Sequence, residues 1–331
     1  MEEKISMRKI YYSPFENSGN DYCNRMKSFL SSYGEVLPLN KSNFIKLFFL
    51  IRIKDYIFLN WIENSIIKNG KFNIFGFLKV FFLMILYRLS LGTLVFVKHN
   101  NYPHDCCEED IKISMWAIKI FEKIANKVVI HSIPDLRGDY FYIPHPLYEE
   151  LEDPNLVNSD SDNYLIFGRI LPYKKIEQVI EVFPRNKNLI IAGSCDNEIY
   201  LKKIKNICLS KPNIEILPRF LEHNEIKSLV EKSAGILITH NDDDMIVSGS
   251  FFYAMTLKSK VYALETPFFK WAEKMMGRKY ITLFKNLNEL STEILSDAYS
   301  ESMKSQSNMI DLFGEKTMHK YISNFFDGKN T

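Results

Sequence analysis

The alternation of strand-like and helix-like segments is the feature that most constrains the fold of this chain. Short runs rich in Val, Ile, Phe and Tyr alternate with longer segments of helical period, and this pattern occurs in both halves of the sequence. Because such an alternation builds parallel sheets covered by helices, each half is expected to form an open α/β sheet. Sheets of this kind bind ligands at the carboxyl ends of their strands.

The expected elements follow from this alternation. In the first half, strands are predicted at 9–12, 35–39, 56–61, 93–98, 127–131 and 139–143, and helices at 20–32, 42–54, 72–88 and 111–126. In the second half, strands are predicted at 164–170, 188–192, 214–218, 235–239, 260–264 and 280–283, and helices at 175–183, 198–209, 223–232, 248–257 and 287–297. A last helix is predicted over Glu315–Phe326.

Length and a polar segment near the middle predict two domains. At about 150 residues per domain, a chain of 331 residues makes two. The run Asn-Ser-Asp-Ser-Asp-Asn at 158–163 is the best candidate for a linker. We therefore expect one Rossmann-like domain over 1–150, a second over 163–314, and a C-terminal helix over 315–331 that packs back on the cleft or on the first domain.

Composition excludes disorder and gives no case for nucleic acid. Hydrophobic residues make up 46% of the chain and aromatic residues 14%, which is enough to bury real cores. The net charge of +2 provides no basic surface for a polyanion. The five cysteines are odd in number and show no C-x-x-C spacing, so they are expected as reduced thiols of a cytoplasmic protein.

One segment departs from this charge balance. From Lys41 to Lys98 the chain carries nine basic residues against only Asp55 and Glu63. The longest uncharged piece of its apolar helix has eight residues, whereas a membrane span needs about 20. Two interpretations stay open, which are a peripheral contact with an anionic membrane surface and buried helix faces with solvated lysines.

The first candidate site is the turn after the predicted strand 164–170. That strand ends in Gly168 and Arg169, and Lys174 opens the next helix. Two cations fixed in this way can converge on one anion, which suits a diphosphate leaving group on which negative charge grows. The structural alternative is an ordinary surface Arg and Lys at a strand–helix corner.

A second candidate is the small-residue run before the apolar helix 251–257. Ser248, Gly249 and Ser250 let backbone N–H groups approach a phosphate, and the helix dipole adds to the attraction. Ser248 is also an ordinary N-cap, and taken in isolation this residue favours capping alone.

Polar residues at two strand ends of the first half form a third candidate. His99 and His104 follow the predicted strand 93–98, and either can act as a base or hold a hydroxyl. The first strand-to-helix turn holds Asn20, Asp21 and Tyr22 and lacks G-x-G-x-x-G. No P-loop motif G-x-x-x-x-G-K-[ST] is present either, so neither dinucleotide binding nor P-loop chemistry is supported.

Taken together and in this order, these pieces resemble a bacterial GT-B glycosyltransferase, family-4-like, of the kind that builds capsular, exopolysaccharide or O-antigen chains. Phe-Gly-Arg-x-x-Pro-Tyr-Lys at 167–174 resembles the family's phosphate-binding Gly-Arg…Lys, and Leu-Ile-Ile-Ala-Gly-Ser at 189–194 resembles its second strand and glycine turn. His-Asn-x-x-Pro-His at 99–104 resembles a segment of its N-terminal domain. Val-Ile-His-Ser at 129–132 and Ile-Pro-His-Pro at 143–146 also fit, so the resemblance covers most of the chain.

The resemblance implies two Rossmann-like domains that face each other across a cleft. It implies a cytoplasmic enzyme that transfers a hexose from a UDP- or GDP-sugar to a glycan or lipid-linked saccharide without a metal or other cofactor. The basic stretch 41–98 fits a peripheral contact of this enzyme with the inner membrane face. The residues implied to bind the donor are Gly168, Arg169, Lys174, Ser194, Arg219, Phe220, Ser248, Gly249 and Ser250. The catalytic candidates are His99, His104 and Asp21, and the acceptor-binding candidates are Asn20, Tyr22 and Asn100.

Three departures separate this chain from that family. Family-4-type enzymes carry Glu-x7-Glu around the donor helix, where this chain has Met245 and Tyr253, and Lys175 replaces the glycine that usually follows the lysine. Since the second glutamate normally holds the ribose, ribose recognition is expected to differ. Retention or inversion of configuration stays open, as do two alternatives: a GT-B-fold nucleotide-sugar epimerase and a non-catalytic GT-B-like partner subunit.

Overall fold

The computed structural model describes residues 8–17, 21–39, 51–103, 106–133, 139–149, 161–240, 244–295 and 307–329. The chain divides into two compact units. The first comprises Met1–Tyr148, Asp244–Val247 and Leu312–Thr331, and the second comprises Glu149–Asp243 and Ser248–Asp311. The two units are described separately below.

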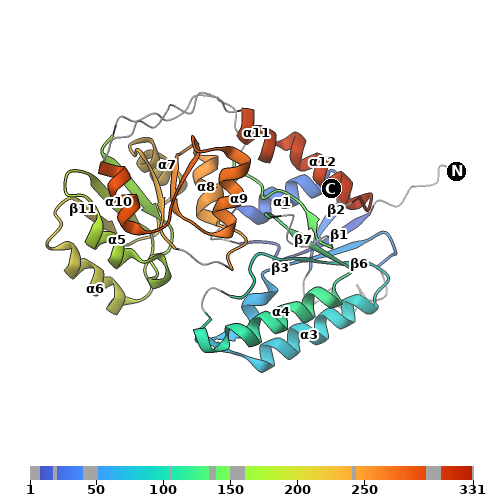
Figure 1. Ribbon diagram of the computed structural model, residues 1–331. Coiled ribbons are helices and arrows are strands. Elements are labelled where there is room, and N and C mark those ends of the chain that lie inside the picture. The colour runs from blue at the N-terminus through green and yellow to red at the C-terminus, as the bar shows by residue number, and fades with distance from the viewer. Residues whose placement is uncertain are drawn as a thin grey trace. The chain divides into compact units, whose positions relative to one another are not determined.

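The first unit is built on a six-stranded sheet in which every neighbouring pair is parallel. Its strands, in the spatial order β2-β1-β3-β6-β7-β8, are β2 (Glu35–Pro38), β1 (Lys9–Ser13), β3 (Tyr56–Asn60), β6 (Thr93–Val97), β7 (Lys127–Ile130) and β8 (Phe141–Tyr142) (Figure 1). The central strand β3 is buried along its whole length, which explains its unbroken apolar sequence.

Helices cover both faces of this sheet. α3 (Ile74–Leu89) and α4 (Ile111–Ile124) lie side by side on one face, where Phe77 packs in one core with Ile57 (Figure 1). α1 (Tyr22–Ser31) and α12 (Glu315–Phe326) contact each other. The Phe325 ring of α12 lies 5.7 Å from that of Phe58, which points to the face opposite Ile57 because successive strand residues alternate. The end of the chain therefore completes the core of the first unit.

The second unit repeats the plan with another six-stranded sheet of parallel neighbours. In the order β11-β10-β9-β12-β13-β14 its strands are β11 (Ile214–Leu217), β10 (Asn188–Ala192), β9 (Asn163–Phe167), β12 (Gly235–Ile238), β13 (Val261–Leu264) and β14 (Ile281–Phe284). The helices around it are α5 (Ile176–Val182), α6 (Glu198–Cys208), α7 (His223–Glu231), α8 (Gly249–Thr256), α9 (Pro267–Met276), α10 (Leu287–Leu295) and α11 (Ser307–Phe313).

The strand order of the second sheet marks where a ligand can bind. The chain runs from β9 outward through β10 to β11, and then returns to the other side of β9 to form β12. At such a reversal the loops after two neighbouring strands diverge and leave a crevice at their carboxyl ends. The residues that follow β9 and β12 are therefore the ones placed to meet a ligand.

The expected α/β class with two Rossmann-like sheets is confirmed. Every predicted strand is present, although β9 already ends at Phe167, where Gly168 turns the chain, and the strand predicted at 139–143 is reduced to β8. Most of the predicted helix 42–54 lies outside the described residues, and 51–54 are not helical.

Besides α11 and the short 3-10 helices, two elements were not foreseen from the sequence. One is α9, although Thr266 caps its first turn by accepting a hydrogen bond from the Phe269 amide and Pro267 stands at the first helical position. The other is a hairpin of β4 (Ile67–Lys68) and β5 (Lys71–Phe72), whose turn residues Asn69 and Gly70 have φ of 53° and 80°. Asn-Gly favours this left-handed hairpin turn, so both elements carried a readable signal.

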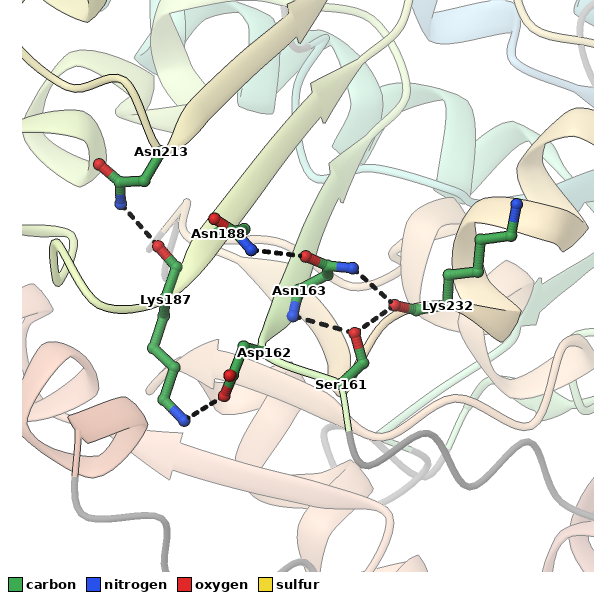
Figure 2. A network of polar contacts seen from close by, with 7 residues as sticks. All are labelled: Ser161, Asp162, Asn163, Lys187, Asn188, Asn213 and Lys232. Carbon is green, nitrogen blue, oxygen red and sulfur yellow. Dashed lines mark hydrogen bonds and ion pairs between the residues drawn. The ribbon is translucent and has the colours of Figure 1, made fainter.

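A polar network ties together the amino-terminal ends of the second sheet (Figure 2). Asn163 at the start of β9 donates to the Lys232 carbonyl at 3.2 Å, and Asn188 at the start of β10 donates to the Asn163 side chain at 3.0 Å. Ahead of β11, Asn213 donates to the carbonyls of Pro184 and Lys187 at 2.8 and 2.6 Å. These contacts fix the strand starts and leave the opposite edge of the sheet free for chemistry.

Replacing Asn213 with Ala is expected to destabilise the protein by about 1–3 kcal/mol, because two carbonyls lose their donor. Asn188→Ala is the matched control: it breaks an exposed bond that water can replace, so the change should stay below about 1 kcal/mol. Urea unfolding of both variants measures the difference. Equal losses in the two variants would contradict the assigned role of Asn213.

Candidate functional site

The candidate site of the second unit begins at the glycine that ends β9. Gly168 has a φ of +90°, a left-handed conformation that side chains disfavour. A Cβ atom there would lie 3.2 Å from Nζ of Lys174 and 3.7 Å from Oγ of Ser250. The end of β9, the ammonium of Lys174 and the start of α8 thus meet at one point, which brings the candidate residues Gly168, Lys174 and Ser250 together.

Lys174 is buried at this junction. Its side chain reaches back from the 3-10 turn Pro172–Lys174, and Nζ donates to the Phe167 carbonyl at 3.0 Å. Burial, and after it the charge of Arg169, lowers the pKa of Lys174 to about 8. A bound anion in contact with Nζ would oppose both effects, so the site favours an anionic ligand.

Arg169 is held more loosely than Lys174. Its guanidinium pairs with Asp196 at 3.0 Å, and both side chains are more than half exposed. Exposed pairs of this kind contribute about 0–1 kcal/mol, so little holds Arg169 on Asp196. The guanidinium is therefore able to turn to a ligand, although in the structure it is paired with Asp196.

The loop after β10 packs directly on the loop after β9. A Cβ atom on Gly193, whose φ is +146°, would lie 2.3 Å from the Gly168 carbonyl oxygen. The amide of Ile170 donates to the Ser194 carbonyl at 2.8 Å. A side chain at 193 would push the two loops apart, which explains why the sequence has Ala-Gly-Ser at this point. Ser194 thus borders the site through its backbone.

The amino end of α8 holds three further predicted donor-site residues, Ser248, Gly249 and Ser250. Ser248 is buried, and its Oγ accepts a hydrogen bond from the Phe251 amide at 3.3 Å, so the capping role is present. In an α-helix the first amides have no partner within the helix, and the dipole makes this end partially positive. The amides of Gly249 and Ser250, the first two residues of α8, are consequently suited to an anion.

Lys175 occupies the position where the resembling family has glycine, and the backbone explains that preference. Its φ of 55° lies in the left-handed region. A non-glycine residue there costs about 1–2 kcal/mol. The chain retains the loop shape of the motif with a residue that is less suited to it.

Tyr253 and His223 form a contact that the sequence analysis did not identify. The Tyr253 hydroxyl lies 2.6 Å from Nδ1 of His223, and Nε2 of that ring lies 2.6 Å from a Glu149 carboxylate oxygen. The second approach is not aligned as a hydrogen bond. Burial, and then the Glu149 charge, raises the pKa of Tyr253 to about 12. The hydroxyl stays neutral, at the position where a glutamate was expected.

Arg219 and Phe220 follow β11 and are exposed. Both guanidinium ends of Arg219 donate to the Glu225 carboxylate, at 3.0 and 2.6 Å. The Phe220 ring is 64% exposed, although nothing in the described fold requires an aromatic residue there. An exposed ring beside a strand end can stack on a flat ligand.

In the first unit, two of the predicted residues, His99 and Tyr22, fall in a buried cluster of rings. His99 and Tyr22 are buried, with ring centroids 5.0 Å apart, and the Tyr22 hydroxyl lies 2.7 Å from Nε2 of His131. His145 lies 5.5 Å from His131, centroid to centroid. Burial lowers the pKa of His131 to about 4, and it holds those of His99 and His145 well below 6.5. All three rings are therefore neutral bases at physiological pH.

The other predicted residues of the first unit differ in placement. Asn100 is buried and donates to Glu63 at 3.4 Å, whereas Asp21 is exposed at the start of α1 and accepts from Asn24 at 2.8 Å. Asn20 and His104 lie outside the described residues. In the described part of the chain, no three His, Cys, Asp or Glu side chains are arranged to hold a metal ion.

Glu63 is the buried charge of this cluster, and the sequence analysis did not select it. It lies in the 3-10 helix Ile62–Ile66, just after β3, and is fully buried. Burial raises its pKa to about 7. A carboxyl group with such a pKa can give or take a proton at neutral pH. The only sequence signal was its position beyond a buried strand end.

Glu63→Gln should change how stability depends on pH. Between 4.5, the ordinary pKa, and about 7, the folded state holds a proton that the unfolded state has lost, so wild-type stability falls as pH rises. Relative to wild type, the Gln variant should gain up to about 1.4 kcal/mol per pH unit across this window. Taking the difference between the two proteins removes the opposite contribution of the histidines. Urea unfolding between pH 4.5 and about 7 measures the free energy of unfolding of both proteins. If the two free energies change with pH in parallel, the raised pKa of Glu63 is wrong.

Comparison with known proteins shows that solved structures with a similar fold exist. No family model matches the sequence, and no curated protein matches it. Among solved structures, the chain is similar to Anabaena HepE in complex with UDP-glucose, with a TM-score of 0.64 and 12% identity over 97% of this chain and 100% of that one. It is also similar to AviGT4, a glycosyltransferase involved in avilamycin A biosynthesis, with a TM-score of 0.59 and 10% identity over 97% of both chains.

A third similar structure is longer. S. aureus TarM, in a complex that includes UDP, gives a TM-score of 0.60 and 15% identity over 86% of this chain, which matches 58% of the TarM chain. At such identities the likeness establishes the fold alone. The two-sheet architecture expected from the sequence, the GT-B type, is thereby confirmed.

Proposed function

We propose that the chain is a glycosyltransferase that moves a hexose from a nucleotide-sugar, a UDP- or GDP-sugar, to a glycan or lipid-linked saccharide in surface polysaccharide synthesis. The observation that supports this most is the junction at Gly168, where the buried ammonium of Lys174 meets the amino end of α8. Similar structures hold UDP or UDP-glucose on the same fold. In this proposal the enzyme is cytoplasmic and works at the inner membrane face.

In this proposal, different residues of the second unit bind different parts of the donor. Lys174, the amides of Gly249 and Ser250, and Arg169 after leaving Asp196 hold the diphosphate and stabilise the charge that grows as the glycosidic bond breaks. These groups supply that stabilisation without a metal ion. The donor phosphate can accept the acceptor proton in a retaining reaction. An inverting reaction needs a base, for which Asp21, His99 and His104 are the candidates.

The nucleoside is recognised by residues that replace the family's glutamate. In this proposal the Tyr253 hydroxyl, held by His223, bonds the ribose in place of the missing carboxylate. The exposed ring of Phe220 stacks on the base. A neutral hydroxyl offers a weaker hydrogen bond than a carboxylate, so more of the donor affinity rests on the diphosphate.

Thermal shift with UDP, GDP, CMP and dTDP, in EDTA, tests this function. One nucleotide at about 100 Kd should stabilise the wild type by about 2.7 kcal/mol. Lys174→Met should weaken that nucleotide by at least about tenfold, because a charge-assisted bond is lost. The matched control is Lys175→Gly, which removes the neighbouring lysine and restores the residue that its backbone prefers.

Each other outcome has a defined meaning. No shift with any nucleotide, in a protein that is folded without ligand, would refute the donor site and favour a non-catalytic partner subunit. Conversion of the nucleotide-sugar to its epimer without an acceptor would favour the epimerase. A shift that appears only after EDTA is replaced by a divalent metal would refute the metal-free clamp.

A further inference from the structure

The two sides of α3 are both apolar, but in the described part of the chain only one of them is packed in the core. Phe77, Val80, Met84 and Tyr87 are buried against the first sheet and its neighbours. The opposite side exposes six large apolar side chains, called here the α3 face: Ile74, Phe75, Leu78, Phe82, Leu86 and Leu89. Phe75 is 81% exposed and Leu89 66%. No helix in the described part of the chain is long and apolar enough to cross a bilayer.

The α3 face is continuous along the helix. At 3.6 residues per turn, its six side chains fall within an arc of about 120°. α4 runs beside α3 and adds Trp116, which is 54% exposed and whose ring lies 5.7 Å from that of Phe77 (Figure 1). Scattered single apolar residues are normal on a surface, whereas a contiguous patch of this kind marks a contact.

Basic side chains border this apolar arc. Lys79 and Arg88, both exposed, lie about 20° and 40° beyond its two edges. Between residues 51 and 103, all of which the structure describes, every exposed charged side chain is basic: Arg52, Lys54, Lys68, Lys71, Lys79 and Arg88. The two acidic residues of that stretch, Asp55 and Glu63, are buried. Along α3 the patch is thus apolar at its centre and basic at both edges. Beyond its amino-terminal end lie two exposed acidic residues, Glu108 and Glu109, next to Asp110, which accepts a hydrogen bond from the Phe72 amide.

This charge pattern selects one kind of occupant. A second copy of the chain would bring the same basic border against itself, which is repulsive. A bilayer with anionic headgroups takes aromatic and aliphatic side chains below the headgroup level while its charges attract lysine and arginine. Phe75, Phe82 and Trp116 are side chains that such an interface favours.

We propose that the α3 face docks in the plane of an anionic lipid bilayer, with α3 lying on the membrane and not across it. The docking involves only α3 and the residues that border it. It is therefore independent of the proposed transferase activity. It takes up the membrane interpretation of the basic stretch, because the apolar residues of α3 are divided between the core and an exposed outer face.

Flotation with phospholipid vesicles tests the docking. The full-length protein should float with vesicles that contain phosphatidylglycerol, bind less as salt rises, and bind weakly to phosphatidylcholine alone. Phe75→Ser with Phe82→Ser should abolish flotation. The matched control is Ile199→Ser with Leu209→Ser, which removes two apolar side chains of the second unit that are 83% and 85% exposed and should leave flotation unchanged.

A second variant separates charge from apolar contact. Lys79→Gln with Arg88→Gln should weaken binding to anionic vesicles by about tenfold or more, with little effect on phosphatidylcholine. Thermal shift with nucleotide should be the same in all these variants, so a failed donor site and a failed membrane contact are told apart.

Two results would overturn the proposal. One is wild-type protein that does not float with anionic vesicles, or that floats equally well after Phe75→Ser with Phe82→Ser. The other is a lipid-free dimer in light scattering that becomes monomeric in the same variant, because the α3 face would then be covered by a second copy.

Discussion

The buried ammonium of Lys174 is the constraint on which the second unit's site depends. Its hydrogen bond to the Phe167 carbonyl closes the turn after β9, and the missing side chain at Gly168 leaves the space in which Nζ lies. Gly193 must then be free of a Cβ atom, since its loop packs on the Gly168 carbonyl. A lone buried cation is costly, and an anion is the ligand that relieves that cost. Local backbone shape and ligand charge are therefore linked through one side chain.

In the first unit the polar groups of the buried cluster are largely neutral, in contrast to the buried cation of the second unit. His99, His131 and His145 are held neutral, and Glu63 is a carboxyl with a pKa near 7, so the cluster carries little charge at physiological pH. Neutral groups that can exchange protons suit a neutral hydroxyl group better than an anion. Both sheets have six parallel strands. The groups buried near their strand ends differ in charge, because the cluster of the first unit is largely neutral and Lys174 of the second unit is a cation.

Sequence alone predicted most of the fold and part of the site. Runs such as Tyr56–Asn60 are apolar at every position because both faces of a parallel sheet are covered, and that pattern is visible in one dimension. The pairing of Gly168 with Lys174 was also visible, because both lie in one short motif. Tyr253 with His223 was not, since 30 residues separate them and only the fold brings them together. Glu63 was missed because its burial, which sets its pKa, cannot be read from its neighbours in sequence.

Calorimetry of UDP binding in buffers of different ionisation enthalpy tests the central role of Lys174 most directly. If the ligand anion contacts Nζ, binding raises the pKa of Lys174 above about 8, so the complex takes up a proton when the pH is near that value. The account predicts proton uptake and an affinity that falls as pH rises through about 8, with both effects lost in Lys174→Met. If the wild type binds UDP with the same affinity below and above about pH 8 and takes up no proton, the account is contradicted.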